Sequence, residues 1–155
     1  MFEYDYEGIK YYFIDNESMF GGAKPYTDPY GDIRKFVFFC KAVLSILPSI
    51  DFKPEIIHCH DWQTGLVPVY LDTFRGSEFY KDIKTVMTIH NLKFQGRWVM
   101  SEIKDVTGLG DEYFTPDKLV LSNDDFFVNG MHTGIEIIDG GVTIYIDMPE
   151  DKRPK

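Results

Sequence analysis

Residues 55–91 read EIIHCHDWQTGLVPVYLDTFRGSEFYKDIKTVMTIHN, and this stretch predicts the centre of the fold. Residues 55–60 form a short apolar run rich in β-branched side chains, which is typical of a buried strand. Residues 62–74 have the length and apolar spacing of a helix, with Asp61 as the expected N-cap, and residues 83–90 read as a second buried strand. This order predicts a βαβ unit with two parallel strands and a right-handed crossover.

Polar side chains follow both strands of this unit. One strand ends in His58-Cys59-His60-Asp61 and the other in His90-Asn91. Parallel neighbours place their carboxyl ends at one edge of a sheet, and open α/β sheets bind ligands outside that edge. Each residue alone is readily explained as a strand or helix cap, but their convergence predicts a ligand site.

Composition limits the class of protein. The chain has 155 residues, enough for one domain, and its 44% hydrophobic content is that of a globular protein. A formal net charge of −9 argues against nucleic acid and anionic membrane surfaces as partners. Cys40 and Cys59 lie in apolar segments, so we expect reduced core thiols and a cytoplasmic protein. We find neither a signal peptide nor an apolar run long enough to span a membrane.

The flanking segments predict further elements. Residues 2–6 and 9–14 are rich in aromatic and β-branched side chains and flank Glu7-Gly8, which predicts a β-hairpin. A helix with an apolar stripe is expected next, with Asp32 as its N-cap and Pro48 at its end. A short helix is expected over residues 102–109, closed by Gly110. Residues 134–138 and 142–146 flank a turn and predict a second hairpin. We therefore predict an α/β fold: a partial Rossmann-like domain with a parallel sheet core, an N-terminal hairpin and a C-terminal β-hairpin.

A metal site is the less favoured interpretation of the histidines. In a strand, His58 and His60 point to the same face, so both rings can reach one ion, with His90 or Asp61 completing the site of a metal hydrolase. In a strand buried on both faces, His58 is better explained as a hydrogen-bonded core residue. The sequence contains no nucleophile elbow and no phosphate-binding glycine loop.

Two motifs resemble the bacterial glycogen synthases and plant starch synthases. Residues 58–65, HCHDWQTG, are similar to the family pattern H-x-H-D-W-x-x-G. Residues 88–96, TIHNLKFQG, are similar to T-[IV]-H-N-L-x-[FY]-Q-G at the family's separation. Supporting matches are YYFIDN at 11–16, Pro25-Tyr26, Asp32 with Arg34 and Phe36, and YFTPD at 113–117. The resemblance runs over residues 2–118.

The resemblance implies a retaining glucosyltransferase that moves glucose from ADP-glucose, or UDP-glucose, to the non-reducing end of an α-1,4-glucan, without a metal or other cofactor. His90 matches the family's active-site histidine and Asp61 the aspartate of the H-D-W motif, so both are expected to be catalytic. Tyr26, Asn91 and Gln95 match positions near the substrates. With His60 of the strand-end group, they are the expected substrate-binding residues.

The sequence also departs from the family pattern. The N-terminal strand with its K-[TS]-G-G-L loop and the second Rossmann domain are not found, so we expect an incomplete and inactive fragment of a synthase. We divide the chain into a partial synthase domain, residues 1–118, and a divergent tail with a hairpin, residues 119–155, in the same compact unit. The alternative is a non-catalytic domain that binds glucan or forms a homodimer through an exposed sheet edge or the tail.

Overall fold

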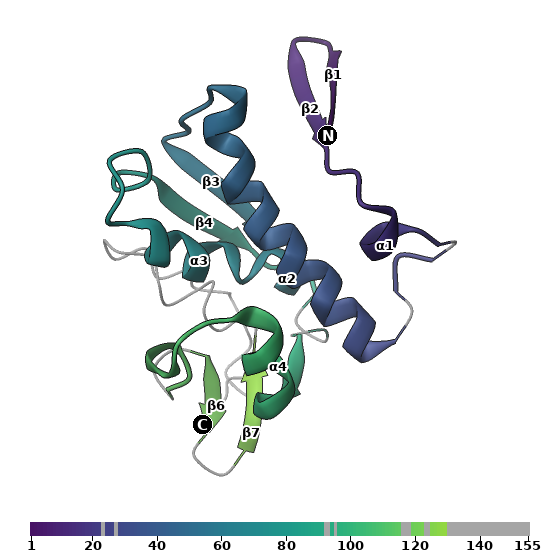
Figure 1. Ribbon diagram of the computed structural model, residues 1–155, viewed down its shortest axis with the longest axis vertical. Coiled ribbons are helices and arrows are strands. Elements are labelled where there is room, and N and C mark those ends of the chain that lie inside the picture. The colour runs from purple at the N-terminus through teal and green to yellow at the C-terminus, as the bar shows by residue number, and fades with distance from the viewer. Residues whose placement is uncertain are drawn as a thin grey trace.

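The structure, a computed structural model, describes residues 1–22, 24–26, 28–91, 94, 96–115, 119–122 and 125–129. Its body contains a parallel strand pair, β3 (Ile56–His60) and β4 (Lys84–Thr88), connected through helix α3 (Val67–Phe74). The long helix α2 (Pro29–Ile46) runs across the pair and contacts α3 (Figure 1). The predicted βαβ unit and the α/β fold class are confirmed.

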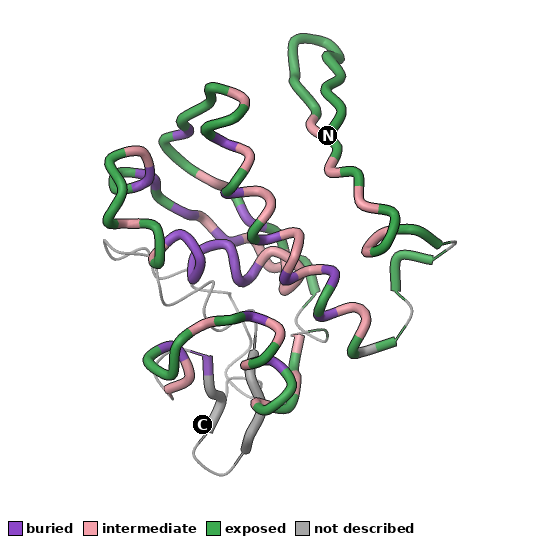
Figure 2. The backbone as a smooth tube through the Cα atoms, viewed as in Figure 1, coloured by how far each residue is buried: buried purple, intermediate pink, exposed green. Residues whose placement is uncertain are grey.

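Burial differs between the two faces of the β3–β4 pair. Cys59 and Met87 point inward and are 1% and 2% exposed, whereas Ile56, His58 and His60 on the other face of β3 are exposed. The buried residues lie along α3 and the inner side of α2 (Figure 2). The prediction that both strands are buried on both faces was wrong for β3, because the described helices cover one face only.

The segment expected as one helix over residues 62–74 has two parts. A 3₁₀ turn, Trp62–Thr64, precedes α3, which carries Pro68 in its first turn, where the missing N–H costs nothing. Asp61 occupies the predicted N-cap position of this turn, but its side chain makes no capping hydrogen bond to it. Its carboxylate is used elsewhere, as described below.

Helix α2 begins four residues earlier than predicted. The side chain of Asp28 accepts a hydrogen bond from the Gly31 N–H at 2.8 Å and is the N-cap, while Asp32 lies in the first turn. The helix ends at Ile46, and Pro48 lies in the following 3₁₀ turn, Leu47–Ile50. The predicted apolar stripe does enter the core, with Cys40, Leu44 and Leu47 buried.

The N-terminal hairpin is confirmed and stands apart from the body (Figure 1). Strands β1 (Phe2–Tyr6) and β2 (Ile9–Phe13) pair antiparallel around Glu7 and Gly8, whose φ angles are 52° and 79°. Two consecutive positive φ angles are the geometry of a two-residue hairpin turn that matches strand twist. A four-residue helix, α1 (Glu17–Phe20), capped by Asn16, connects the hairpin to the loop before α2.

A second sheet follows the body. Strands β5 (Arg97–Val99), β7 (Asp125–Asn129) and β6 (Val120–Ser122) pair antiparallel in that order, next to α4 (Met100–Thr107) and the 3₁₀ turn Asp111–Tyr113. Helix α4 ends at Gly108, with φ of 64°, rather than at the predicted Gly110. The hairpin expected over residues 134–146 lies outside the described residues, and the division of the chain at residue 118 stays a prediction.

None of the described helices combines the length and apolar composition that crossing a bilayer requires. Cys40 and Cys59 are both free and buried, as expected. Burial raises the pKa of each thiol to about 12, and Cys40 Sγ contacts the Gln63 carbonyl oxygen at 3.2 Å. Both cysteines therefore act as packing residues in the core.

Candidate functional site

Asp61 joins the ends of the two parallel strands. Its backbone N–H donates to the Thr88 carbonyl oxygen at 2.9 Å, which extends the strand pairing by one bond. Its Oδ1 accepts from the backbone N–H of His90 at 2.7 Å and of Asn91 at 3.4 Å. The strand-end residues therefore meet at one edge, as the parallel topology predicted.

The backbone of Asp61 is held in an unusual conformation. Its φ and ψ angles are 54° and −175°, close to a region that almost only glycine adopts. Such a conformation costs on the order of 1–3 kcal/mol and persists where surrounding interactions over-determine it. The hydrogen bonds to Thr88, His90 and Asn91 supply that constraint.

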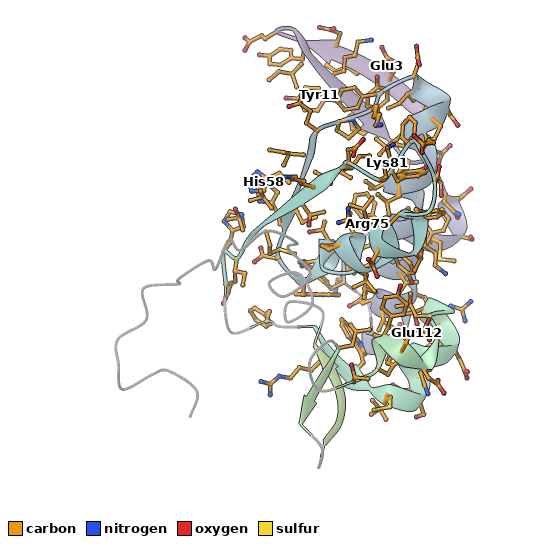
Figure 3. The ribbon with its side chains drawn as sticks, turned by 90° about the vertical axis from the view of Figure 1, so that its left-hand side faces the viewer. Glu3, Tyr11, His58, Arg75, Lys81 and Glu112 are labelled. Carbon is orange, nitrogen blue, oxygen red and sulfur yellow. The ribbon has the colours of Figure 1, made fainter. Side chains whose placement is uncertain are left out.

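The three histidines of the strand ends form a contiguous row. The His58 and His60 rings are 4.2 Å apart between centroids, and His60 Nδ1 lies 3.0 Å from His90 Nε2. His58 Nε2 is hydrogen-bonded to Thr88 Oγ1 at 2.7 Å. Figure 3 shows His58 on the side of the strands away from Arg75 and Lys81. His58 is thus hydrogen-bonded, as expected, but exposed, and its expected place in the core was wrong.

Thr64 closes the end of β3. Its Oγ1 accepts from the His60 N–H at 2.6 Å and donates to the His60 carbonyl oxygen at 2.8 Å. Both backbone polar groups of His60 are therefore satisfied by one side chain of the following turn. These two hydrogen bonds fix the main chain from which the His60 ring projects.

A cleft of about 610 Å³ opens beside Asp61. It is lined by Tyr26, Asp32, Asp61, Trp62, Gln63, Asn91 and Phe94. The Gln63 side-chain amide donates to Tyr26 Oη at 2.7 Å, which fixes the loop before α2 over the turn after β3. Aromatic surface together with convergent carboxylate and amide groups suits a polyhydroxylated ligand with apolar faces.

An aromatic cluster supports this cleft. The Phe36 and Trp62 rings meet edge-on at 4.8 Å between centroids, and Trp62 and Trp98 are also 4.8 Å apart. Gly96, with φ of 65°, passes so close that a Cβ there would lie 2.8 Å from Trp98 and 2.9 Å from Trp62. The loop after β4 is thereby packed against the turn after β3.

The charge of the cleft lining is negative. Asp32 and Asp61 contribute carboxylates, and among the described residues the lining contains no Lys or Arg. Lys35, behind Asp32 and 8% exposed, donates to the Pro25 carbonyl oxygen at 2.7 Å and lies 3.4 Å from Asp32 Oδ1. This cation is therefore already committed to the protein, and the cleft suits a neutral sugar better than a phosphate.

The structure brings most of the predicted site residues together. Asp61, His60, His90 and Asn91 meet at the strand ends. Asp61, Asn91 and Tyr26 line the cleft, whereas its described lining includes neither His60 nor His90. Gln95 lies outside the described residues. In the described part of the chain, no group of three or more His, Cys, Asp or Glu side chains is placed to hold a metal ion, so the donor set of a hydrolytic metal centre is not formed there.

Sequence reasoning missed several residues of the site. Trp62, Gln63 and Phe94 line the cleft, and Thr64 and Thr88 hold the histidine row. The first two directly follow Asp61, so their position after a strand end was an available signal. Phe94 and Thr88 belong to the motif at residues 88–96, which was an available signal for both, although their contacts depend on segments distant in the sequence.

The chain matches the sequence model of a family described as the starch synthase catalytic domain over residues 1–144. It is 60% identical to the glycogen synthase of Lachnoclostridium phytofermentans over 129 residues, which are 83% of this chain and 27% of that protein. It is 54% identical to the glycogen synthase of Lachnospira eligens over 145 residues, 93% of this chain and 30% of that protein.

A solved structure shows the same relationship. The catalytic domain of starch synthase IV from Arabidopsis thaliana, bound to ADP and acarbose, matches with a TM-score of 0.70 and 32% identity, over 85% of this chain and 27% of that chain. The chain thus spans less than a third of the length of these relatives. The resemblance inferred from the two motifs is confirmed.

Variants of Asp61 test whether its backbone is strained and how much its hydrogen bonds to His90 and Asn91 stabilise the fold. We expect Asp61→Ala to lower the free energy of unfolding by about 1–3 kcal/mol, because two backbone N–H groups lose their acceptor. Asp61→Gly should be more stable than Asp61→Ala by about 1 kcal/mol, because relief of strain exceeds the added chain entropy of glycine. Asp61→Asn, which keeps Oδ1, should be closest to wild type. Urea denaturation measures all three, and equal stability of the Gly and Ala variants would contradict a strained Asp61 backbone.

Proposed function

The chain belongs to the starch synthase catalytic domain family, and from that premise we propose that its cleft serves a retaining glucosyltransferase. The donor is ADP-glucose and the acceptor is the non-reducing end of an α-1,4-glucan. The bond from glucose C1 to the diphosphate breaks and ADP leaves, a bond from C1 to the acceptor oxygen forms with the same anomeric configuration, and the proton of the acceptor hydroxyl passes to the departing diphosphate. The observation that carries this proposal is the meeting of Asp61, His90 and Asn91 at one strand edge beside the cleft.

Asp61 and His90 are the proposed catalytic residues. A transition state with oxocarbenium character requires charge and dipoles that are already in place. Asp61 supplies the charge, and its hydrogen bond to the His90 N–H at 2.7 Å fixes the two residues relative to one another. His90 contacts the transferred glucose, while Tyr26, Asn91 and Gln95 contribute substrate contacts.

The diphosphate leaving group sets a limit on this chain. A departing diphosphate needs cations, and in the described part of the cleft the lining supplies carboxylates instead. Lys35 is already bonded to Pro25 and Asp32. We therefore propose that the 155-residue chain has little or no turnover by itself and acts together with the remaining parts of a synthase.

The further properties of the proposed enzyme follow from this assignment. No metal or other cofactor takes part, nucleic acids and membranes are not partners, and the location is the cytoplasm, where buried free thiols such as Cys40 and Cys59 stay reduced. A net charge of −9 is consistent with this set of partners.

Incorporation of labelled glucose from ADP-glucose into glycogen tests the proposal. We expect no incorporation by the purified chain, and incorporation by a protein in which residues 1–144 replace the matching region of a full-length glycogen synthase. Transfer by the isolated chain would contradict its proposed dependence on the remaining parts. A folded but inactive chimera would contradict the glucosyltransferase assignment itself.

In that chimera, we expect His90→Ala to reduce transfer below detection while the protein remains folded, because the ring is exposed and contributes little to the core. Thermal unfolding of the variant measures the second point. His58→Ala is the matched control, since its ring contacts His60 and Thr88. Full activity of the His90 variant would overturn the catalytic role of His90.

A second candidate function, self-association, is favoured by the N-terminal hairpin. One of its faces consists of large apolar side chains that are 42–63% exposed, namely Phe2, Tyr4, Tyr6, Ile9, Tyr11 and Phe13. At roughly 200 Å² for a buried aromatic side chain, this face would bury on the order of 600 Å² per copy. Two copies face to face then reach about 1,200 Å², the lower limit of stable interfaces. We propose that this face of the hairpin packs against the same face of a second copy of the chain.

Light scattering measures this directly. We expect a molar mass above that of the 18.0 kDa monomer for the wild-type chain. The double variant Tyr4→Ser, Tyr11→Ser, which removes one cross-strand pair from the face, should be monomeric. The double variant Glu3→Ser, Lys10→Ser on the opposite face is the control and should behave as wild type. A strictly monomeric wild type would eliminate the homodimer.

A further inference from the structure

The His60 and His90 rings meet nitrogen to nitrogen. His60 Nδ1 and His90 Nε2 approach to 3.0 Å although the ring centroids are 5.3 Å apart, and the ring planes are inclined by only 18°. This is the geometry of a ring-to-ring hydrogen bond of ordinary length. His60 is the last residue of β3, and His90 lies two residues after the end of β4, so only the folded chain forms this contact.

Such a bond couples the proton positions of the two rings. A neutral imidazole has one nitrogen that donates and one that accepts, and a hydrogen bond between two rings requires one of each. When His90 Nε2 donates, His60 Nδ1 accepts, and when His90 Nε2 accepts, His60 Nδ1 carries the proton. In either polarity the tautomer of His90 is tied to that of His60, and the His90 ring is held in one orientation.

We propose that His60 is a positioning residue that holds the His90 ring in one orientation and ties the tautomer of His90 to its own. The inference rests on the proposed role of His90 at the transferred glucose. It also changes the expected role of His60, which we had predicted to bind substrate directly. Because Nδ1 of His60 faces His90, the ring acts on the ligand through His90.

His60 is itself held firmly enough for this task. Thr64 Oγ1 bonds both backbone polar groups of His60, at 2.6 Å and 2.8 Å. On the ring side, His58 packs against it at 4.2 Å and is anchored by Thr88 Oγ1 at 2.7 Å. The main chain of His90 is anchored in turn by Asp61 Oδ1 at 2.7 Å. A hydrogen bond between two fixed main chains leaves each ring little freedom to reorient.

An alternative explanation is that the histidine row only packs against the exposed sheet face. Packing and positioning differ in one observable. Loss of packing changes stability, whereas the ring-to-ring hydrogen bond transmits a scalar coupling between the two nitrogens. The hydrogen bond at His90 Nε2 is therefore the quantity to measure.

NMR of the 155-residue chain with ¹⁵N-labelled histidine makes this measurement without substrate. In wild type we expect a scalar coupling across the hydrogen bond between His90 Nε2 and His60 Nδ1. In His60→Ala the coupling should vanish and the shift of His90 Nε2 should change, because this nitrogen loses its partner. Unchanged His90 shifts in this variant would overturn the proposal.

Two further variants separate positioning from structure. His60→Asn places an amide, which can donate or accept, near the former Nδ1 and should restore a hydrogen bond to His90 Nε2, as a packing role would not. His58→Ala removes the neighbouring ring but not the hydrogen bond and should leave the coupling between His60 and His90 unchanged. If His60→Ala does not fold, the wild-type coupling decides, because its absence overturns the proposal without any variant. A negative result here leaves the glucosyl-transfer assay unaffected, so failure of this inference and failure of the proposed function are distinguishable.

Discussion

The carboxylate of Asp61 is the interaction on which the site depends. One oxygen accepts hydrogen bonds from the main chain of His90 and Asn91, while the Asp61 backbone bonds to Thr88. These contacts tie the turn after β3 to the loop after β4, and they hold a backbone conformation that is unfavourable for aspartate alone. The Asp61 carboxylate thus has a structural role that is independent of any role in catalysis.

The cleft is built outward from this junction. Trp62 and Gln63 follow Asp61 directly, and Gln63 reaches Tyr26 in the loop before α2. Gly96 lets the chain after β4 pass against Trp62 and Trp98. Three segments distant in the sequence therefore contribute to one cleft, which explains why both aromatic and polar groups line it.

One-sided burial explains the character of the histidine row. The described helices cover one face of the β3–β4 pair, so Cys59 and Met87 are buried while His58 and His60 remain accessible (Figure 2). Exposure lets the rings interact with one another and with a ligand, whereas a core position would have required each ring to be satisfied by protein alone. The acidic cleft and the internally bonded Lys35 likewise favour neutral sugars over phosphates at this edge.

The sequence by itself determined the elements that depend on local pattern. The β3–α3–β4 unit and the N-terminal hairpin follow from apolar periodicity and from the turn at Glu7-Gly8, and the parallel topology brought His60, Asp61 and His90 to one edge. Two long motifs were sufficient to indicate the family. These features need only neighbouring residues or a general rule of chain topology.

Only the tertiary structure decided which partners the polar side chains take. Asp61 and Asp32 both have the character of helix caps, yet Asp61 bonds across to His90 and Asp28 caps α2 instead. The same applies to burial, because side chains along β3 alternate between exposed and buried only as a result of the helices packing on one face of the strand pair. A side-chain hydrogen bond is chosen by distance in three dimensions, and the competing acceptors and donors are brought within that distance only when the chain has folded.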